Sequence, residues 1–204
     1  MLPRTLPDGT VVVVRPQTPE DRHRIADFFA RLSPVSRYQR FFTGTPPHLP
    51  SKMLDALANV DGDRHVGLLA VRGSRILGAA RYLRRADTPA VADVAFTVAD
   101  EMQGRGLGRL LMRELQAHAR RRNITRFVFD ALATNDAALA VAESLGARLR
   151  HDGVTVEGVI YIESGAETPS RPSARAIVRR AATQRPRRND SSRRGSAPTT
   201  RQSR

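Results

Sequence analysis

The sequence predicts a mixed α/β protein in which a mostly antiparallel sheet of six or seven strands is flanked by helices on both faces. Short apolar and β-branched runs alternate along the chain with segments whose apolar residues recur at helical spacing. Two such runs, His65–Arg72 and Arg75–Arg84, are separated only by Gly73-Ser74, which is typical of a β-hairpin. Another run, residues 94–98, leads through glycines into a helical leucine pattern.

The elements before the hairpin are expected to be one strand and three helices. Thr10–Arg15 reads as the strand, and Thr18-Pro19-Glu20-Asp21 has the form of a capping box with proline in the first helical position. The helix that follows carries its apolar stripe on Ile25, Phe28, Phe29 and Leu32. A second short helix is expected from Ser33-Pro34 to about Phe42, then a proline-rich loop over Thr43–Pro50 and a helix over Ser51–Val60.

After the hairpin, strands and helices are expected to alternate. Val91–Ala99 predicts a buried strand, and leucines 107, 110, 111 and 115 predict a helix that begins inside the glycines. The remaining expected elements are a strand over Arg126–Leu132, a helix over Asn135–Leu145, and closing strands near Ala147–His151 and Val154–Ile162.

The segment from Gln103 to Gly108 has the composition of an anion-binding loop. A strand, glycines and a helix N-terminus together offer free backbone N–H groups and a favourable helix dipole. Arg105 and Arg109 add cationic donors beside it. A Walker A loop is excluded because the only lysine, Lys52, is far from the glycines, and the G-x-G-x-G spacing differs from the dinucleotide fingerprint.

The pattern formed by Gln103, Gly106 and Gly108 resembles that of the GNAT superfamily of acyl-CoA N-acyltransferases. The order of elements from about Thr10 to Glu163 is similar to a GNAT domain. The string from Phe28 to Phe42 further resembles bacterial protein lysine acetyltransferases, although core packing also explains its aromatic residues. The resemblance implies acetyl-CoA as co-substrate, and it implies a phosphate-binding loop made of Gln103, Gly104, Arg105, Gly106, Leu107, Gly108 and Arg109.

The resemblance also implies where the rest of the cofactor lies. The backbones of Phe96, Thr97 and Val98 are expected to pair with pantetheine, with Val98 the oxyanion donor. Asn135 is a helix N-cap by sequence, and in the family this residue type contacts pantetheine. Many GNAT enzymes place a proton-donating tyrosine seven residues later, where this chain has Ala142. Water or a group such as Tyr82 would then supply the proton.

Asp93 is the candidate general base, because an acceptor amine must lose a proton before it attacks a thioester. The resemblance implies a glutamate at this position, and this chain has the shorter aspartate. The alternative is a structural ion pair with a neighbouring arginine such as Arg81.

The chain contains no cysteine, which rules out a cysteine acyl-enzyme and favours direct transfer from acetyl-CoA to the amine. No histidine and carboxylate cluster has metal-ligand spacing, so no metal is expected. No apolar run is long enough to cross a membrane and the N-terminus does not resemble a signal peptide, so we expect a cytoplasmic protein.

The charge divides the chain into a GNAT domain over residues 1–164 and an arginine-rich, disordered tail over residues 165–204. The tail carries +9 of the formal net charge of +14 and no aromatic residue. The tail either binds polyanions nonspecifically or has no function, and the sequence leaves both alternatives open. Two functions therefore stand: an N-acetyltransferase that acts on a protein lysine or a small amine, or a weakly catalytic acyl-CoA-binding module that the tail tethers to polyanions.

Overall fold

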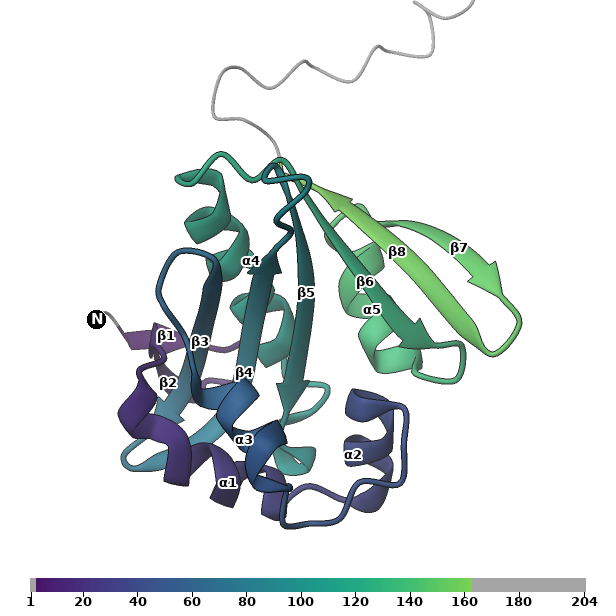
Figure 1. Cartoon of the computed structure of the whole chain (residues 1–204). Helices are drawn as coiled ribbons and strands as arrows, with labels where there is room; N and C mark the ends of the chain where they lie inside the picture. Colours follow the sequence, from purple (N-terminus) through teal and green to yellow (C-terminus); the bar gives the residue numbers. More distant parts are fainter. Residues whose placement is uncertain (1–2, 163–204) are drawn as a thin grey trace, which may run out of the picture. The chain divides into compact units, whose positions relative to one another are not determined.

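The computed structural model describes residues 3–162, which form an eight-stranded sheet with helices on both faces (Figure 1). The strand order is β1-β2-β3-β4-β5-β6-β8-β7, and β5 and β6 are its only parallel neighbours. Within these residues no helix is long and apolar enough to cross a membrane. The strands are β1 (Pro3–Thr5), β2 (Val11–Pro16), β3 (His65–Arg72), β4 (Arg75–Arg84), β5 (Val91–Val98), β6 (Arg126–Leu132), β7 (Arg148–Asp152) and β8 (Thr155–Tyr161).

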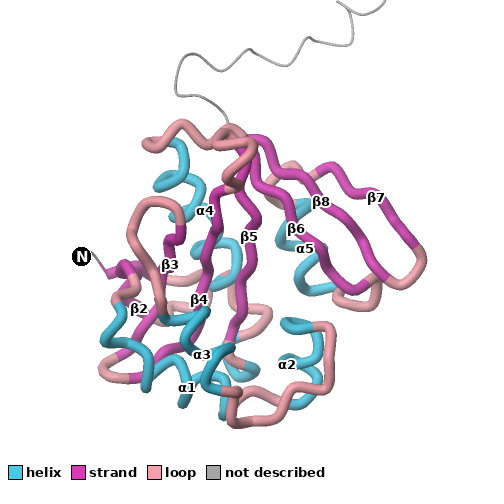
Figure 2. Tube along the Cα trace, viewed as in Figure 1, coloured by secondary structure: helices cyan, strands magenta, loops and turns pink. Residues whose placement is uncertain are grey.

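The helices form a layer on each side of the sheet (Figure 2). A Cβ atom added to Gly78 of β4 would lie 2.9 Å from Leu111, so one face is covered closely by α4. Three residues along, Arg81 points to the opposite face and donates to the carbonyl of Leu57 in α3 at 2.7 Å. The helices are η1 (Pro19–Asp21), α1 (Arg22–Ala30), α2 (Pro34–Phe41), α3 (Ser51–Ala58), η2 (Asp100–Met102), α4 (Leu107–Arg120) and α5 (Asp136–Glu143).

The predicted helix starts and apolar stripes are confirmed. All four residues of the first stripe are buried, as are Leu107, Leu111 and Leu115 of α4. The backbone N–H of Thr18 donates to the carboxylate of Asp21, and the hydroxyl of Ser33 accepts from the N–H of Ser36 as an N-cap. The hairpin and β6 have the predicted bounds. Local capping and periodicity therefore set most of the fold.

The sheet has one more strand than expected. β1 was missed because it has three residues and begins with a proline, which leaves too little length for an alternating pattern. It pairs with β2 at the edge of the sheet. The expected tail over residues 165–204 lies outside the described residues.

The feature that positions the site is a gap between β5 and β6. These strands pair only where residues 91–93 meet residues 126–128. β5 then continues to Val98 and β6 to Leu132 without pairing with each other, so the sheet opens at the end of β5 that leads into the glycine loop.

Candidate functional site

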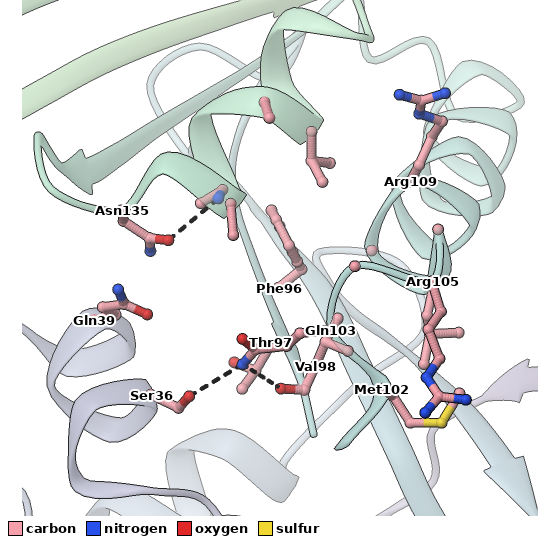
Figure 3. Close-up of a pocket in the computed structure, with 18 of the residues that line it drawn as sticks. Ser36, Gln39, Phe96, Thr97, Val98, Met102, Gln103, Arg105, Arg109 and Asn135 are labelled. Carbon is pink, nitrogen blue, oxygen red and sulfur yellow. Dashed lines mark hydrogen bonds between the residues drawn. The ribbon is translucent and has the colours of Figure 1, made fainter. Parts of the chain in front are cut away.

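A cavity with a volume of about 720 Å³ lies against the glycine loop. Its walls come from β5, the loop, the start of α4, and facing sides of α2 and α5 (Figure 3). It brings together every residue predicted to bind the cofactor: Phe96, Thr97, Val98, Gln103, Gly104, Arg105, Gly106, Leu107, Gly108, Arg109 and Asn135.

The glycines give this loop a shape that other residues would not adopt. Gly104 and Gly106 have φ angles of 72° and 84°, in the left-handed region. A Cβ atom on Gly108 would lie 3.0 Å from the ring of Phe96. Within residues 3–162, the backbone N–H groups from Gly104 to Arg109 donate no hydrogen bond. A loop of free donors at the start of a 14-residue helix fits a pyrophosphate.

A hydrogen-bond network joins this loop to α2. The carboxylate of Asp100 accepts from the N–H and hydroxyl of Ser33 at 2.8 and 2.7 Å, and from the hydroxyl of Ser36 at 2.6 Å. Burial raises the pKa of Asp100, but the bonds from Ser36 and Ser33 outweigh it and hold the pKa below its usual value. The side chain of Gln103 donates to the same Ser36 hydroxyl and to the carbonyl of Val98. The carboxylate thus fixes one wall of the cavity relative to the other.

Two arginines stand beside the loop. Arg105 is 3.1 Å from the carboxylate of Asp8, which also lines the cavity. Arg109 lies one helical turn further along and lines the cavity without an ion pair among the described residues. Both side chains are therefore placed for contact with an anion on the loop.

The exposed edge of β5 supplies backbone donors. The N–H of Ala99 donates to the carbonyl of Leu77 in β4, so alternation turns the backbones of Val98 and Phe96 away from β4 and toward the gap. The backbone of Thr97 faces β4 instead, and this residue contributes its buried side chain to the cavity. Of the three residues expected to pair with pantetheine through their backbones, only Phe96 and Val98 therefore have backbone groups that face the gap.

The second cavity, of about 210 Å³, lies in the gap between β5 and β6. The two cavities share Gln39 and Arg40 of α2, Phe96, and the start of α5. There the side chain of Asn135 accepts from the N–H of Ala138 at 3.2 Å, which confirms the predicted N-cap (Figure 3). Ala142 lines this cavity, so the position where the family carries tyrosine does face the gap.

Asp93 lines neither cavity. Its carboxylate is 52% exposed and lies 2.7 Å from Arg85, whose side chain makes three hydrogen bonds to it. The ion pair considered for Asp93 thus exists, but its partner is Arg85. Arg81 was the wrong arginine because its side chain turns under the sheet toward α3.

Tyr82 is not placed to protonate a leaving group. It is fully buried on the α4 face, and its hydroxyl lies 3.1 Å from Nδ1 of His118. Burial raises its pKa to about 12. The sequence did not indicate that α4 covers the face of the sheet on which Tyr82 lies.

Five polar residues of the cavities were missed by the sequence reasoning, and two of them, Asp8 and Ser36, line only the first cavity. Gln39 and Arg40 lie in the aromatic string of α2, where the pattern suggested packing, and Asp130 lies on β6. The signal for Asp130 was strand alternation, because it lies on the same face as Val128, the residue paired with Asp93. No comparable signal marked Gln39 or Arg40.

Comparison with known proteins gives a consistent picture. The model of the acetyltransferase (GNAT) family matches residues 33–147. Acetyltransferase PA5475 of Pseudomonas aeruginosa is 33% identical over 146 residues, which cover 70% of this chain and 77% of that protein. Acetyltransferase Pat of Mycolicibacterium smegmatis is 30% identical over 148 residues, 72% of this chain, but the match spans only 44% of that longer protein.

Among solved structures, the GNAT domain of S. lividans PAT is similar in both fold and sequence. It is 32% identical, with a TM-score of 0.73, and the match covers 78% of this chain and 96% of that domain.

Proposed function

The chain belongs to the GNAT acetyltransferase family, and from that premise we propose that it transfers the acetyl group of acetyl-CoA directly to the side-chain amine of a protein lysine. The observation that carries the proposal is that the two cavities adjoin and share a wall, which includes Gln39, Arg40 and Phe96. One lies on a loop of free N–H donors and the other lies in the gap between β5 and β6. An acceptor in the gap would thus meet the end of a cofactor held by the loop.

The proposed cofactor site uses backbone groups more than side chains. The N–H groups from Gly104 to Arg109 would bind the pyrophosphate, with Arg105 and Arg109 adding charge. The outward N–H groups of Phe96 and Val98 would bond to the pantetheine arm and to the thioester oxygen. Asn135 already caps α5 with its carbonyl oxygen, so its amide nitrogen remains for the arm.

The chemistry needs one proton acceptor. The amine nitrogen forms a bond to the acyl carbon, the C–S bond breaks, the amine proton passes to a base, and the CoA thiolate takes a proton from solvent. Asp93 is the proposed base, acting through water, because it lies on the same face of β5 as Ala95, which lines the gap. Asp130 is the competing carboxylate, since it lines the second cavity directly.

The lysine acceptor rests on the resemblance of the string from Phe28 to Phe42 to bacterial protein lysine acetyltransferases. Gln39 and Arg40 of that string line both cavities, so the segment that carries the resemblance also forms the wall between cofactor and acceptor. Contact of the basic tail with polyanions stays a proposal that salt-dependent binding of the full chain would test.

Titration calorimetry with acetyl-CoA, run beside thiol release with lysine peptides and small amines, tests the proposal. We expect saturable binding and thiol release that depends on a lysine peptide. Binding with no release from any acceptor would favour the acyl-CoA-binding module, and no binding would refute the assignment of the glycine loop.

A further inference from the structure

Arg40, which lines both cavities, and Arg81, which lies beside the second, have no carboxylate partner among the described residues. Arg40 of α2 lines both cavities, and Ala95, which lines the second cavity, lies directly opposite Arg81 in the register of β4 and β5. Within residues 3–162, neither guanidinium is within 4.0 Å of a carboxylate oxygen.

The contacts that these arginines make are neutral. Arg81 donates to the carbonyl of Leu57 at 2.7 Å and to Oε1 of Gln17 at 3.4 Å. Among the described residues Arg40 donates no side-chain hydrogen bond, and its guanidinium carbon lies 5.1 Å from the ring centroid of Phe41. A guanidinium has five N–H donors, so most of those on Arg40 remain for a ligand.

The surroundings of both charges are unfavourable without an anion. Burial lowers the pKa of Arg40 to about 10. Burial, together with the nearby charge of Arg40, lowers the pKa of Arg81 to about 9. Both side chains keep partial exposure, and Arg40 reaches solvent through the cavities. A partly buried charge of this kind is stabilised by a counterion, and here the counterion has to enter from the cavity.

Arg40 lines the second cavity as well as the one on the glycine loop, so it can also reach a ligand in the gap. The residues that line the second cavity with it, among them Val94, Ala95 and Ala142, belong to the gap and not to the glycine loop. An anion bound in the gap would therefore lie beside the reacting groups. A planar guanidinium pairs with a carboxylate through two parallel hydrogen bonds, which suits a carboxylate attached to a reactant.

We propose that Arg40, supported by Arg81, binds a carboxylate carried by one of the two reactants, an inference that rests on the proposed transferase function. The carboxylate is either the far end of a dicarboxylic acyl group such as succinyl, or part of the acceptor amine. Asp130 lines the same cavity, but it is exposed and makes no ion pair with Arg40, so it leaves the guanidinium free.

The acyl arm compares succinyl-CoA with butyryl-CoA, which has the same number of acyl carbons and no charge. Calorimetry of the full chain should show succinyl-CoA binding roughly 10- to 100-fold more tightly, the range expected of hydrogen bonds to a charged group. Arg40→Gln should abolish this difference and Arg40→Lys should retain part of it. Arg126→Gln, an exposed arginine that lines neither cavity, is the matched control.

The acceptor arm compares γ-aminobutyrate with butylamine. Binding of each to the CoA complex is measured by calorimetry, and transfer from acetyl-CoA is measured as KM and kcat. If the acceptor carries the carboxylate, γ-aminobutyrate should bind more tightly and have the lower KM, and Arg40→Gln should remove both differences. Circular dichroism of each variant establishes that it is folded, and Arg40→Lys serves if Arg40→Gln is not.

A preference in either arm that depends on Arg40 supports the inference and identifies the source of the carboxylate. Equal binding within both pairs, or a preference that persists in Arg40→Gln, overturns it. A binding preference without turnover would leave the inference standing and refute the proposed transfer. Turnover without a binding preference would support the proposed transfer and overturn the inference. Failure of every acyl-CoA to bind refutes both.

Discussion

Gly106 is the single residue at which we expect the proposed cofactor binding to be most sensitive to substitution. Its φ angle of 84° is one that glycine adopts without strain, and it immediately precedes α4, where the free N–H groups converge. Replacing it with alanine should cost about 1 kcal/mol of stability and should weaken acyl-CoA binding tenfold or more, because the donors would be re-aimed. Calorimetry and chemical denaturation measure the two effects.

Gly62→Ala is the matched control for that variant. Gly62 has a similar φ angle of 75°, nothing lies within 4 Å of its added Cβ, and it lines neither cavity. It should lose somewhat less stability, because a Cβ atom on Gly106 would also lie 3.2 Å from the ring of Pro7, and it should keep its affinity for acyl-CoA. Equal loss of affinity in the two variants would contradict the proposed role of the glycine loop.

The proposed base is tested by Asp93→Asn. If Asp93 accepts the amine proton, kcat should fall roughly 100-fold while the affinity for acetyl-CoA stays the same, because general base catalysis contributes at least that much. Rates are measured by thiol release across pH. Glu157→Gln is the control, since Glu157 is an exposed, ion-paired carboxylate that lines neither cavity. A normal rate in Asp93→Asn with a large loss in Asp130→Asn would transfer the role to Asp130.

At the residue scale, the sequence predicted side chains that act through local chemistry. The N-caps Ser33 and Asn135 and the glycines of the loop were found because their function depends on neighbours in the chain. Arg40 and Asp130 were missed because their place in the second cavity depends on how α2 and β6 pack in three dimensions. The predicted partner of Asp93, Arg81, was wrong for the same reason, because the choice of Arg85 depends on where the side chains point.

At the scale of elements, the site depends on how α2 is held against the glycine loop. Asp100 accepts three hydrogen bonds from the first turn region of α2, and Gln103 adds a fourth link. Asp100→Ala should raise hydrogen exchange of the α2 amides and lower kcat/KM about tenfold, because charge-assisted bonds are lost.

The neighbouring Glu101 provides the comparison for that change. It is ion-paired with Arg75 at 2.7 Å on the surface and, among the residues described, makes no hydrogen bond or ion pair with α2. Glu101→Gln should leave both exchange and catalysis near wild type. If Asp100→Ala behaved in the same way, α2 would not be held by this network.

Helices and strands were predicted well where capping or periodicity is strong, and poorly where length is short. β3, β4 and β6 have the expected bounds because each forms a long apolar run between turn residues. Three-residue β1 has no such pattern, and it becomes a strand only because β2 offers an edge for pairing. The free backbone positions of β5 were expected from the family resemblance alone, through the implied pairing of residues 96–98 with pantetheine, since unpaired backbone leaves no side-chain pattern.

For the whole molecule, acid stability depends on a histidine remote from the site. Burial, and then the charges of Arg122 and Arg121, lower the pKa of His118 from 6.5 to about 4. The unfolded chain therefore binds a proton more readily than the folded protein, so the stability that neutral His118 contributes is complete above pH 6.5 and is lost as the pH falls toward 4.

His118→Gln isolates this effect. Between pH 6.5 and 4 the wild-type free energy of unfolding should fall by roughly 1–3 kcal/mol more than that of the variant, a range discounted because the imidazole is partly exposed. Urea denaturation at several pH values measures it. If the free energy of unfolding of the two proteins depended on pH in the same way, protonation of His118 would not destabilise the folded protein.

Within residues 3–162 the sheet opens beside the loop that is proposed to hold CoA, and the proposed transfer depends on this opening. The most direct test is an initial-rate study that varies acetyl-CoA and a lysine peptide together and counts acetylated lysine against released CoA. Direct transfer predicts intersecting lines and one acetylated lysine for each CoA released. Thiol release without acetylated lysine, or a rate independent of the peptide, would contradict the account.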